Sequence, residues 1–259
     1  MPDPPIRELT THCHGPSIAM PAPPSSSVIS LEAGVVEAWY APLAALHDRA
    51  AYFHDLLDPV ELERAARFRF HHDRDRFILG HGLLRSLLGH YLKRDGSLVR
   101  MARGPFGKPF LERKALRFNL SDTKDAVLIA FATDLEIGAD IETMTRDVDH
   151  HAVSEHYFTP PEVQAITEAG SDGKRRFLEL WTRKEAVLKA SGVGIMDDLK
   201  ALRVDAPRNT MLIAHEAFAR MAAPTYHVHT YHVGAEHLIS IASPKPLKAV
   251  RLWDAAAGL

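Results

Sequence analysis

The residues best suited to chemistry include two carboxylates in one short segment. In GADIE, Asp140 and Glu142 lie two residues apart, so on a β-strand their side chains point to the same side. Two carboxylates this close repel each other unless a cation lies between them. The apolar residues around them favour a buried strand, and oxygen ligands select a hard ion such as Mg²⁺ or Mn²⁺. Taken alone, the segment also fits an edge strand with a solvated face.

The segment WTRKEAVLKASG supplies a third carboxylate and a base. Trp181, Glu185 and Lys189 advance four residues at a time, so they lie along one flank of a helix. A solvated Glu–Lys pair would explain the same spacing. If the helix packs over the GADIE strand, Glu185 becomes a third metal ligand and Lys189 stands beside the metal. A metal ion with an ammonium group can neutralise phosphate oxygens as a phosphoanhydride breaks.

Two further segments carry candidate phosphate contacts. Lys108 lies in the glycine- and proline-rich segment GPFGKPFL, which we interpret as a loop. Ser121 ends the predicted strand region RFNLSD, where hydroxyl and N–H groups can hold a phosphate. A solvated turn lysine and a turn-capping serine are the alternatives.

The elements that must position these residues form two similar series. Each series runs from a strand through helices to further strands, which predicts an α+β fold with two pseudo-symmetric halves. We expect an N-terminal half over residues 31–132 and a C-terminal half over residues 133–259. Residues 1–30 are dense in proline and serine without a period, which predicts a flexible tail whose deletion leaves activity and melting temperature unchanged.

Composition limits the classes of function and location. The net charge of −2 over 259 residues gives no global basic field for nucleic acid. The sequence has no run of eighteen apolar residues and no recognisable signal peptide, so we expect no membrane association. Cys13 is the only cysteine; it excludes an intrachain disulfide and suits a reducing compartment, so we expect a cytoplasmic protein.

Two histidine-rich segments invite a metal interpretation that neither supports alone. HCH at 12–14 lies in the predicted tail and is incomplete as a site. In TYHVHTYHV, His227 and His229 would share a strand face that His232 does not. A solvated strand face is the better interpretation of the second segment.

Taken in order, the chemical segments resemble a known family, the phosphopantetheinyl transferases of the surfactin-synthetase activating type. The resemblance runs from about Asp58 to Ala242 and includes ERAARFRFHHDRDRFILGHGLLR, FGKPFL, FNLSD, IGADIE and FLELWTRKEAVLKASGVGI. It implies a monomer that binds coenzyme A in the cleft between two α+β halves. It also implies transfer of 4′-phosphopantetheine to a serine of an acyl or peptidyl carrier protein, with adenosine 3′,5′-bisphosphate released.

The resemblance assigns roles to individual residues. Asp140, Glu142 and Glu185 match the Mg²⁺ ligands, and Lys189 matches the lysine on the pyrophosphate. The other matched coenzyme A contacts are Lys108, Ser121 and Arg64, the last reaching the adenosine 3′-phosphate. In the expected reaction Glu185, or water held by the metal, takes the proton of the carrier serine. Lys189 stabilises the leaving phosphate.

Two positions depart from the family pattern. Asp122 stands where family members often have histidine, so this coenzyme A contact is lost or moved, and Asp122 either faces solvent or joins a hydrated metal. Glu61 stands at a second basic position, three residues before Arg64. Coenzyme A affinity is then lower, or nearby arginines compensate, namely Arg67, Arg69 and Arg76.

Two other functions fit the same residues. One is a Mg²⁺-dependent hydrolase of nucleotide diphosphates, with water in place of the carrier serine. The other is a catalytically weakened homologue that binds coenzyme A or a carrier, which Asp122 and Glu61 favour.

Overall fold

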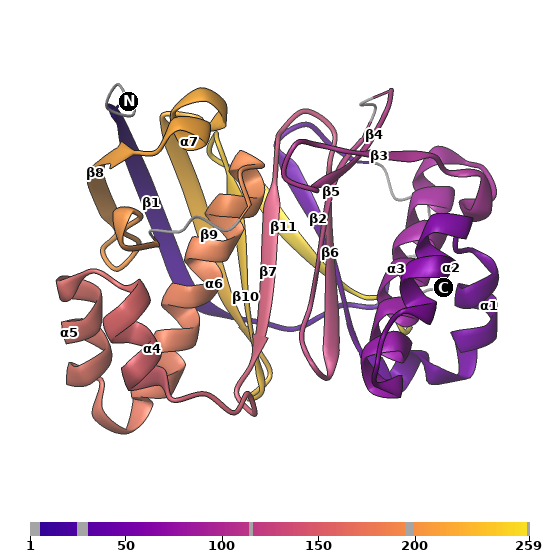
Figure 1. The fold of residues 1–259 in the computed structure, drawn as a ribbon, viewed down its shortest axis with the longest axis horizontal. Helices are drawn as coiled ribbons and strands as arrows, with labels where there is room; N and C mark the ends of the chain where they lie inside the picture. Colours follow the sequence, from indigo (N-terminus) through magenta and orange to yellow (C-terminus); the bar gives the residue numbers. More distant parts are fainter. Residues whose placement is uncertain (1–5, 25–30, 114–115, 195–198, 258–259) are drawn as a thin grey trace.

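The computed structural model describes residues 6–24, 31–113, 116–194 and 199–257 and contains two main β-sheets (Figure 1). The first sheet has the order β11-β2-β6-β5, and its strands are β2 (Val35–Pro42), β5 (Arg117–Asp122), β6 (Ala126–Ala132) and β11 (Ala249–Asp254). The second has the order β7-β10-β9-β1-β8, and its strands are β1 (Ile6–Ala19), β7 (Gly138–Thr143), β8 (Arg208–Ala214), β9 (Thr225–Val233) and β10 (His237–Ser243). A separate hairpin pairs β3 (Met101–Arg103) with β4 (Pro109–Leu111). The predicted α+β class with two sheet-and-helix halves is confirmed.

Helices cover the outer side of the first sheet. They are α1 (Ala50–Asp55), α2 (Pro59–Ala66) and α3 (His71–Leu92), with short 3₁₀ segments η1 (Leu43–Arg49) and η2 (Gly96–Leu98). The start of α2 follows from local sequence: Asp58 and Glu61 form a capping box and Pro59 occupies the first turn. The buried leucines of α3 pack against β6, including Leu84, Leu87 and Leu88. This is the stripe that the helical period predicts.

The second sheet is covered by the longest helix of its half. The elements of this half are α4 (His150–Tyr157), α5 (Pro160–Glu168), α6 (Gly173–Ser191) and α7 (Glu216–Met221), with 3₁₀ segments η3 (Gly170–Asp172) and η4 (Leu199–Ala201). Helix α6 crosses β7 at Gly138, where an added Cβ would lie 2.0 Å from the carbonyl oxygen of Ala186. Only a glycine permits this approach, so the glycine of GADIE fixes α6 over the strand that carries the two carboxylates.

The inner faces of the two sheets pack against each other. Apolar residues of β2, β6 and β11 meet those of β7, β9 and β10 in one core cluster. The edge strands β5 and β7 lie beside each other at this junction. A residue at the end of β5 can therefore reach β7, although the two strands belong to different halves.

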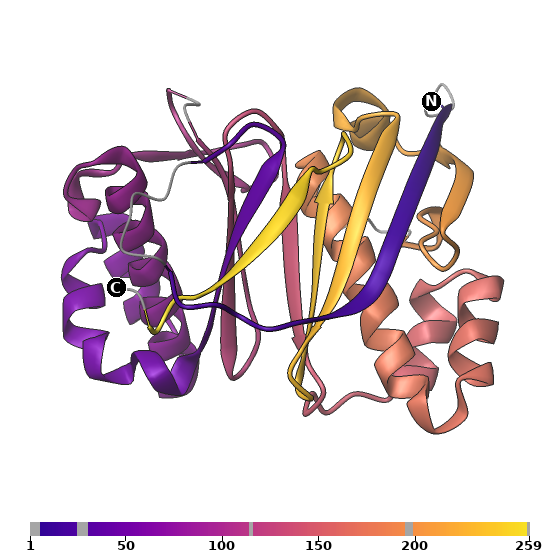
Figure 2. The ribbon, with the colours of Figure 1, turned by 180° about the vertical axis from the view of Figure 1, so that it is seen from behind.

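Each half includes a strand from the opposite end of the chain. Strand β1 lies between β8 and β9 in the second sheet, antiparallel to β8 and parallel to β9 (Figure 2). Strand β11 pairs in parallel with β2 at the edge of the first sheet. The halves are thus not the contiguous stretches 31–132 and 133–259, although the chain passes from one sheet to the other between Ala132 and Gly138.

The prediction of a flexible tail is wrong for Ile6–Ala19. Alternate residues of this strand, Leu9, Thr11 and Cys13, are buried against the second half. Backbone pairing on both sides and burial of this inner face hold the strand in place. Residues 1–5 and 25–30 of the predicted tail lie outside the described residues.

Other differences are local. Residues 150–157, which include three histidines, form α4, whose N-cap Asp149 accepts a hydrogen bond from the Ala152 amide. Part of the GPFGKPFL loop forms β4, and β8 was not predicted. In the part of the chain that is described, no helix is long and apolar enough to cross a membrane.

Candidate active site

Three side chains meet at the junction of β5, β7 and α6. Lys189 Nζ donates to Asp140 Oδ1 at 2.6 Å and to Ser121 Oγ at 2.8 Å. Ser121 Oγ in turn donates to the same Asp140 oxygen at 2.8 Å. The sequence placed these residues in three separate segments, and the fold brings them into direct contact.

Side chains of β5 hold it against the backbone of β7 at this point. Asn119 Oδ1 accepts a hydrogen bond from the Ala139 amide at 2.8 Å, and Ser121 Oγ lies 3.4 Å from the Ile141 amide. Sequence analysis missed Asn119, although it lies in the quoted FNLSD segment. Asn119 lies two residues before Ser121, so both side chains point to the same side of the strand. This spacing was the signal available in the sequence.

Two further carboxylates surround Asp140 without hydrogen-bonding to it. Burial, and then the charge of Asp140, raise the pKa of both Glu142 and Glu185 to about 7. Glu142 forms an ion pair with Arg146, whose guanidinium also lies 5.2 Å from the ring centre of Trp181. Arg146 was not predicted; its only sequence signal is its place four residues after Glu142.

The carboxylate set suits a hard divalent cation. Asp140 is 5% exposed, and its Oδ2 is buried without a hydrogen-bond partner among the described residues. The crowding that raises the pKa of Glu142 and Glu185 would be relieved by a positive ion. As the side chains lie, however, the described chain holds no group of three or more Asp, Glu, His or Cys residues arranged around a metal. Lys189 engages Asp140 and Arg146 engages Glu142, so the three-carboxylate Mg²⁺ set stays a prediction.

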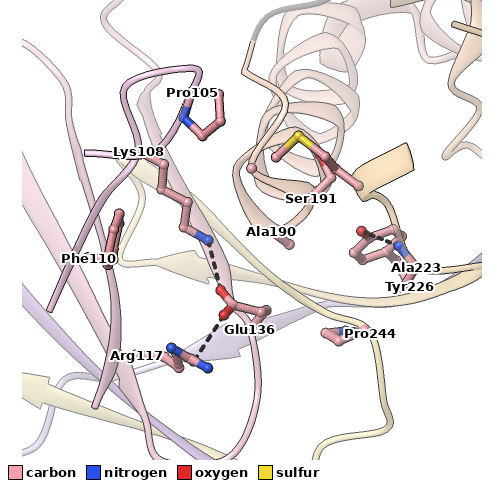
Figure 3. Close-up of a pocket in the computed structure, with 13 residues that line it drawn as sticks. Pro105, Lys108, Phe110, Arg117, Glu136, Ala190, Ser191, Ala223, Tyr226 and Pro244 are labelled. Atoms are coloured by element: carbon pink, nitrogen blue, oxygen red, sulfur yellow. Dashed lines mark hydrogen bonds and ion pairs between the residues drawn. The ribbon is translucent and has the colours of Figure 1, made fainter. Parts of the chain in front are cut away.

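Lys108 lies close to the junction but makes other contacts. Its Nζ donates to the carbonyl oxygen of Ile137 at 2.9 Å. The same Nζ lies 3.5 Å from Glu136, which also pairs with Arg117 (Figure 3). Burial lowers the pKa of Lys108. The alternative of a solvated turn lysine is therefore contradicted, and the coenzyme A contact of Lys108 stays a prediction.

A cavity of about 400 Å³ opens beside Lys108 (Figure 3). The β3–β4 hairpin forms one wall with Pro105 and Phe110, and the end of α6 forms another with Ala190 and Ser191. Ala190 directly follows Lys189 in α6, but Ser121, Asp140 and Lys189 are not among the residues that line the cavity. Most of its lining is apolar, with charged groups at one side.

The two departures from the family pattern have different structural explanations. Glu61 is turned inward: it is 4% exposed and pairs with Arg85, which is fully buried, and with His81. It ties α2 to α3 and leaves Arg64 as the outward cation of α2, over the ring of Phe77 at 5.0 Å. No contact in the described residues joins Arg64 to the Asp140 cluster.

Asp122 is exposed to solvent, one of the two positions considered above, and it also forms an ion pair. Its Oδ2 lies 2.7 Å from Arg76 Nε, and Arg76 Nη2 lies 2.9 Å from Asp73. Partial removal of its carboxylate from water raises the pKa of Asp122, while the charge of Arg76 opposes that shift. Arg76 therefore places a guanidinium at the end of β5, next to the residue that contacts Lys189.

Comparisons with known proteins agree with the motifs. The family model of the 4′-phosphopantetheinyl transferase superfamily matches residues 136–242, and the model "4′-phosphopantetheinyl transferase, N-terminal" matches residues 44–134. The 4′-phosphopantetheinyl transferase HetI of Nostoc sp. is 36% identical over 185 residues, which cover 68% of this chain and 75% of HetI. A phosphopantetheinyl transferase of Thraustochytrium sp. is 33% identical over 62% of each chain. The 4′-phosphopantetheinyl transferase Sfp of Bacillus subtilis is 28% identical over 59% of this chain and 67% of Sfp. The chain therefore belongs to the 4′-phosphopantetheinyl transferase superfamily.

Proposed function

We propose that the protein transfers 4′-phosphopantetheine from coenzyme A to a serine of an acyl or peptidyl carrier protein, with Mg²⁺ and with release of adenosine 3′,5′-bisphosphate. The observation that carries this proposal is the contact of Lys189 with Asp140 and Ser121. It joins a base, a buried carboxylate and a hydroxyl from both halves at one point, as cleavage of a phosphoanhydride requires.

Lys189 and Ser121 bind the pyrophosphate in this proposal. Their hydrogen bonds to Asp140 hold both side chains in place before the substrate arrives, which limits the reorganisation needed during reaction. The ammonium of Lys189 then stabilises the negative charge that grows on the leaving phosphate. Mg²⁺, when bound by Asp140, Glu142 and Glu185, supplies Lewis-acid neutralisation of the phosphate oxygens.

Glu185 is the candidate proton acceptor. Burial and the charge of Asp140 raise its pKa to about 7 in the metal-free protein. A bound Mg²⁺ would oppose that shift and keep Glu185 ionised, so that one carboxylate oxygen can accept the proton. The carrier serine loses that proton as its oxygen attacks the phosphorus attached to pantetheine. The P–O bond to the adenosine-bearing phosphate breaks, so no covalent enzyme intermediate is required.

The cavity beside Lys108 is our candidate binding site for the adenosine part of coenzyme A. It combines an apolar lining with a lysine at its side, and the lining includes Ala190, the residue that follows Lys189 in α6. Such a mixture suits a planar base joined to phosphates. Arg64 and Arg76 supply further cations on α2 and α3 for the remaining phosphate.

Mass spectrometry of several carrier proteins tests the proposal. Incubation with coenzyme A and Mg²⁺ should add about 340 Da to a carrier serine, the mass of the group transferred in this chemistry. Asp140→Asn, which keeps the side-chain shape, should abolish the mass gain while circular dichroism stays native. Release of free phosphopantetheine without a carrier would instead indicate the hydrolase. Coenzyme A binding without any transfer would indicate the weakened homologue.

A further inference from the structure

Side chains of β5 follow the free edge of β7 at the junction of the two halves. The Ala139 amide donates to Asn119 Oδ1 and the Ile141 amide to Ser121 Oγ, so both amides face β5 and not β10. The donors and the acceptors are each two residues apart and advance together, so the two strands run in the same direction. The side chains of β5 therefore supply the partners that the edge strand β7 lacks on this side.

Asp125 continues this series beyond the end of β5. It closes the turn at 123–125, between β5 and β6, and its Oδ2 accepts a hydrogen bond from Thr143 Oγ1 of β7 at 3.1 Å. Its Oδ1 lies 3.0 Å from His237 Nε2 of β10. Its backbone carbonyl accepts from the Leu43 amide at 2.8 Å, which ties the turn to the first half as well. Asp125 thus joins the turn after Ser121 to two strands of the second sheet.

His237 fixes Asp125 from the opposite side. The ring is 5% exposed, and its Nδ1 lies 3.1 Å from the hydroxyl of Tyr40 on β2. An ionised carboxylate only accepts hydrogen bonds, so Nε2 donates to Asp125, and Nδ1 of the neutral ring accepts from Tyr40. Burial, and then the charge of Asp125, raise the pKa of Tyr40 to about 12, so the phenol keeps the proton that it donates. One chain of hydrogen bonds therefore runs from β2 through β10 to the turn.

Ser121 lies between two anchors on β7. Asn119 ties β5 to β7 on one side of it, and Asp125 does so on the other. Ser121 Oγ reaches Lys189 Nζ only while β5 keeps its register along β7, because a slip of one residue turns alternate side chains to the opposite face. In the part of the chain that is described, Asp125 makes no hydrogen bond or ion pair with Ser121, Lys189 or Asp140. Any effect of Asp125 on these groups therefore passes through the position of the strand.

We propose that Asp125 is a positioning residue for phosphopantetheinyl transfer. Held by His237 and Tyr40, it fixes the turn at 123–125 so that Ser121 stays against Lys189, where the pyrophosphate binds. This inference rests on the proposed function, since Ser121 matters for the reaction only as a pyrophosphate contact. The placement of Ser121 by Asp125 can be measured without any substrate.

Amide hydrogen exchange measures that placement. Asp125→Ala should speed exchange of the Ala139 and Ile141 amides, because their acceptors on β5 are no longer held in place. The Asp140 amide, which points towards β10, should keep its protection. Asp125→Asn retains an accepting oxygen and should resemble wild type. Asp149→Ala, which removes a carboxylate hydrogen bond at the start of α4, is the matched control and should leave all three amides unchanged.

A double-mutant cycle measures the link to the reaction. Asp125→Ala should lower kcat/KM for coenzyme A by roughly 10–100-fold, because a displacement of about 1 Å at a reacting group can cost that much. In a Ser121→Ala background the same substitution should have much less effect, since the group that it positions is absent. Tyr40→Phe, which removes only the hydroxyl that holds His237, should cause a smaller loss in the same direction. Asp149→Ala should leave kcat/KM unchanged.

Two outcomes would overturn the proposal. One is unchanged exchange of the Ala139 and Ile141 amides in Asp125→Ala. The other is a cycle in which the losses from Asp125→Ala and Ser121→Ala are fully additive, which would show that Asp125 contributes to stability and does not act through Ser121. Failure of the proposed function has a different signature, since wild-type protein would then transfer nothing to any carrier. Amide exchange would still decide whether Asp125 positions Ser121.

Discussion

Arg76 on α3 and Asp122 on β5 form an ion pair of 2.7 Å at the end of the strand that carries Ser121. The carboxylate of Asp122, which stands where family members often have histidine, is thus paired with the guanidinium of Arg76 from helix α3. Asp122 is therefore not an unpaired anion, although it shares the guanidinium of Arg76 with Asp73. Arg76 Nε faces Asp122 and its Nη2 faces Asp73, and the arginine side chain is 28% exposed.

Arg76→Ala should weaken coenzyme A binding by roughly 10–100-fold, because a hydrogen bond to a charged group is worth about 1.5–3 kcal/mol. The turnover number at saturating coenzyme A should change little, since Arg76 does not contact Lys189 or Asp140. Isothermal titration and steady-state kinetics measure the two effects. Arg74→Ala is the matched control, because Arg74 pairs with its neighbour Asp75 on the same helix. Equal affinities of the two variants would contradict a phosphate contact at Arg76.

Lys189→Ala should lower the turnover number by roughly 10²–10³-fold, the usual loss for one electrostatic contact to developing charge. The KM for coenzyme A should change less. Lys174→Ala tests the same residue type at the start of the same helix, roughly 22 Å away at 1.5 Å per residue. A change confined to KM would show that Lys189 contacts the phosphate only in the ground state.

Leu9→Ala should destabilise the protein by about 2–5 kcal/mol, the cost of removing a buried leucine side chain. Leu9 is 1% exposed in β1, whereas Ile6 on the same strand is 67% exposed. Ile6→Ala should therefore stay within about 0.5 kcal/mol of wild type. Chemical denaturation measures the change in the free energy of unfolding for both variants. If both substitutions are neutral, the packing of β1 is contradicted and the prediction of a flexible tail stands. Deletion of Ile6–Ala19 should yield insoluble protein.

Stability should fall as the pH drops from about 6.5 to about 4, in part through His229. Its folded pKa of about 4 lies below the ordinary histidine value, so in this window the unfolded chain binds a proton that the native chain does not. The contribution is fully present above the unfolded pKa and is lost as the pH approaches the folded pKa. His229→Gln should flatten the dependence of melting temperature on pH in this window, and His47→Gln should not. Parallel pH curves for wild type and His229→Gln would disprove the assignment.

Local signals were sufficient for several elements. The capping box of Asp58 and Glu61 and the leucine period of α3 are contained in the segments that form them. The three residues of the central contact were also predicted, because each belongs to a motif whose residue types suit phosphate chemistry. Their mutual distances were not predictable, since these depend on how β5, β7 and α6 pack.

The remaining features depend on partners far away in the sequence. Strand β1 has alternating buried residues, but its proline-rich surroundings favour a tail, and only insertion between β8 and β9 makes it a strand. Glu61 was interpreted as a lost coenzyme A contact because its partner Arg85 was not considered. In the same way, the ion pair of Asp122 could not be predicted without knowing that Arg76 lies beside it in the fold.

The exchange of terminal strands between the two halves has a consequence for the order of folding during synthesis. The first sheet cannot acquire its edge strand until β11, which follows all the other strands in the chain, has left the ribosome. Strand β1 emerges before the others and must wait for β8 and β9. Neither half can therefore be completed while the other is being made, and pairing over such long separations is slow. Ribosome-bound chains that stop before β8 should expose β1 to proteases and chaperones, a period of vulnerability that two sequential domains would avoid.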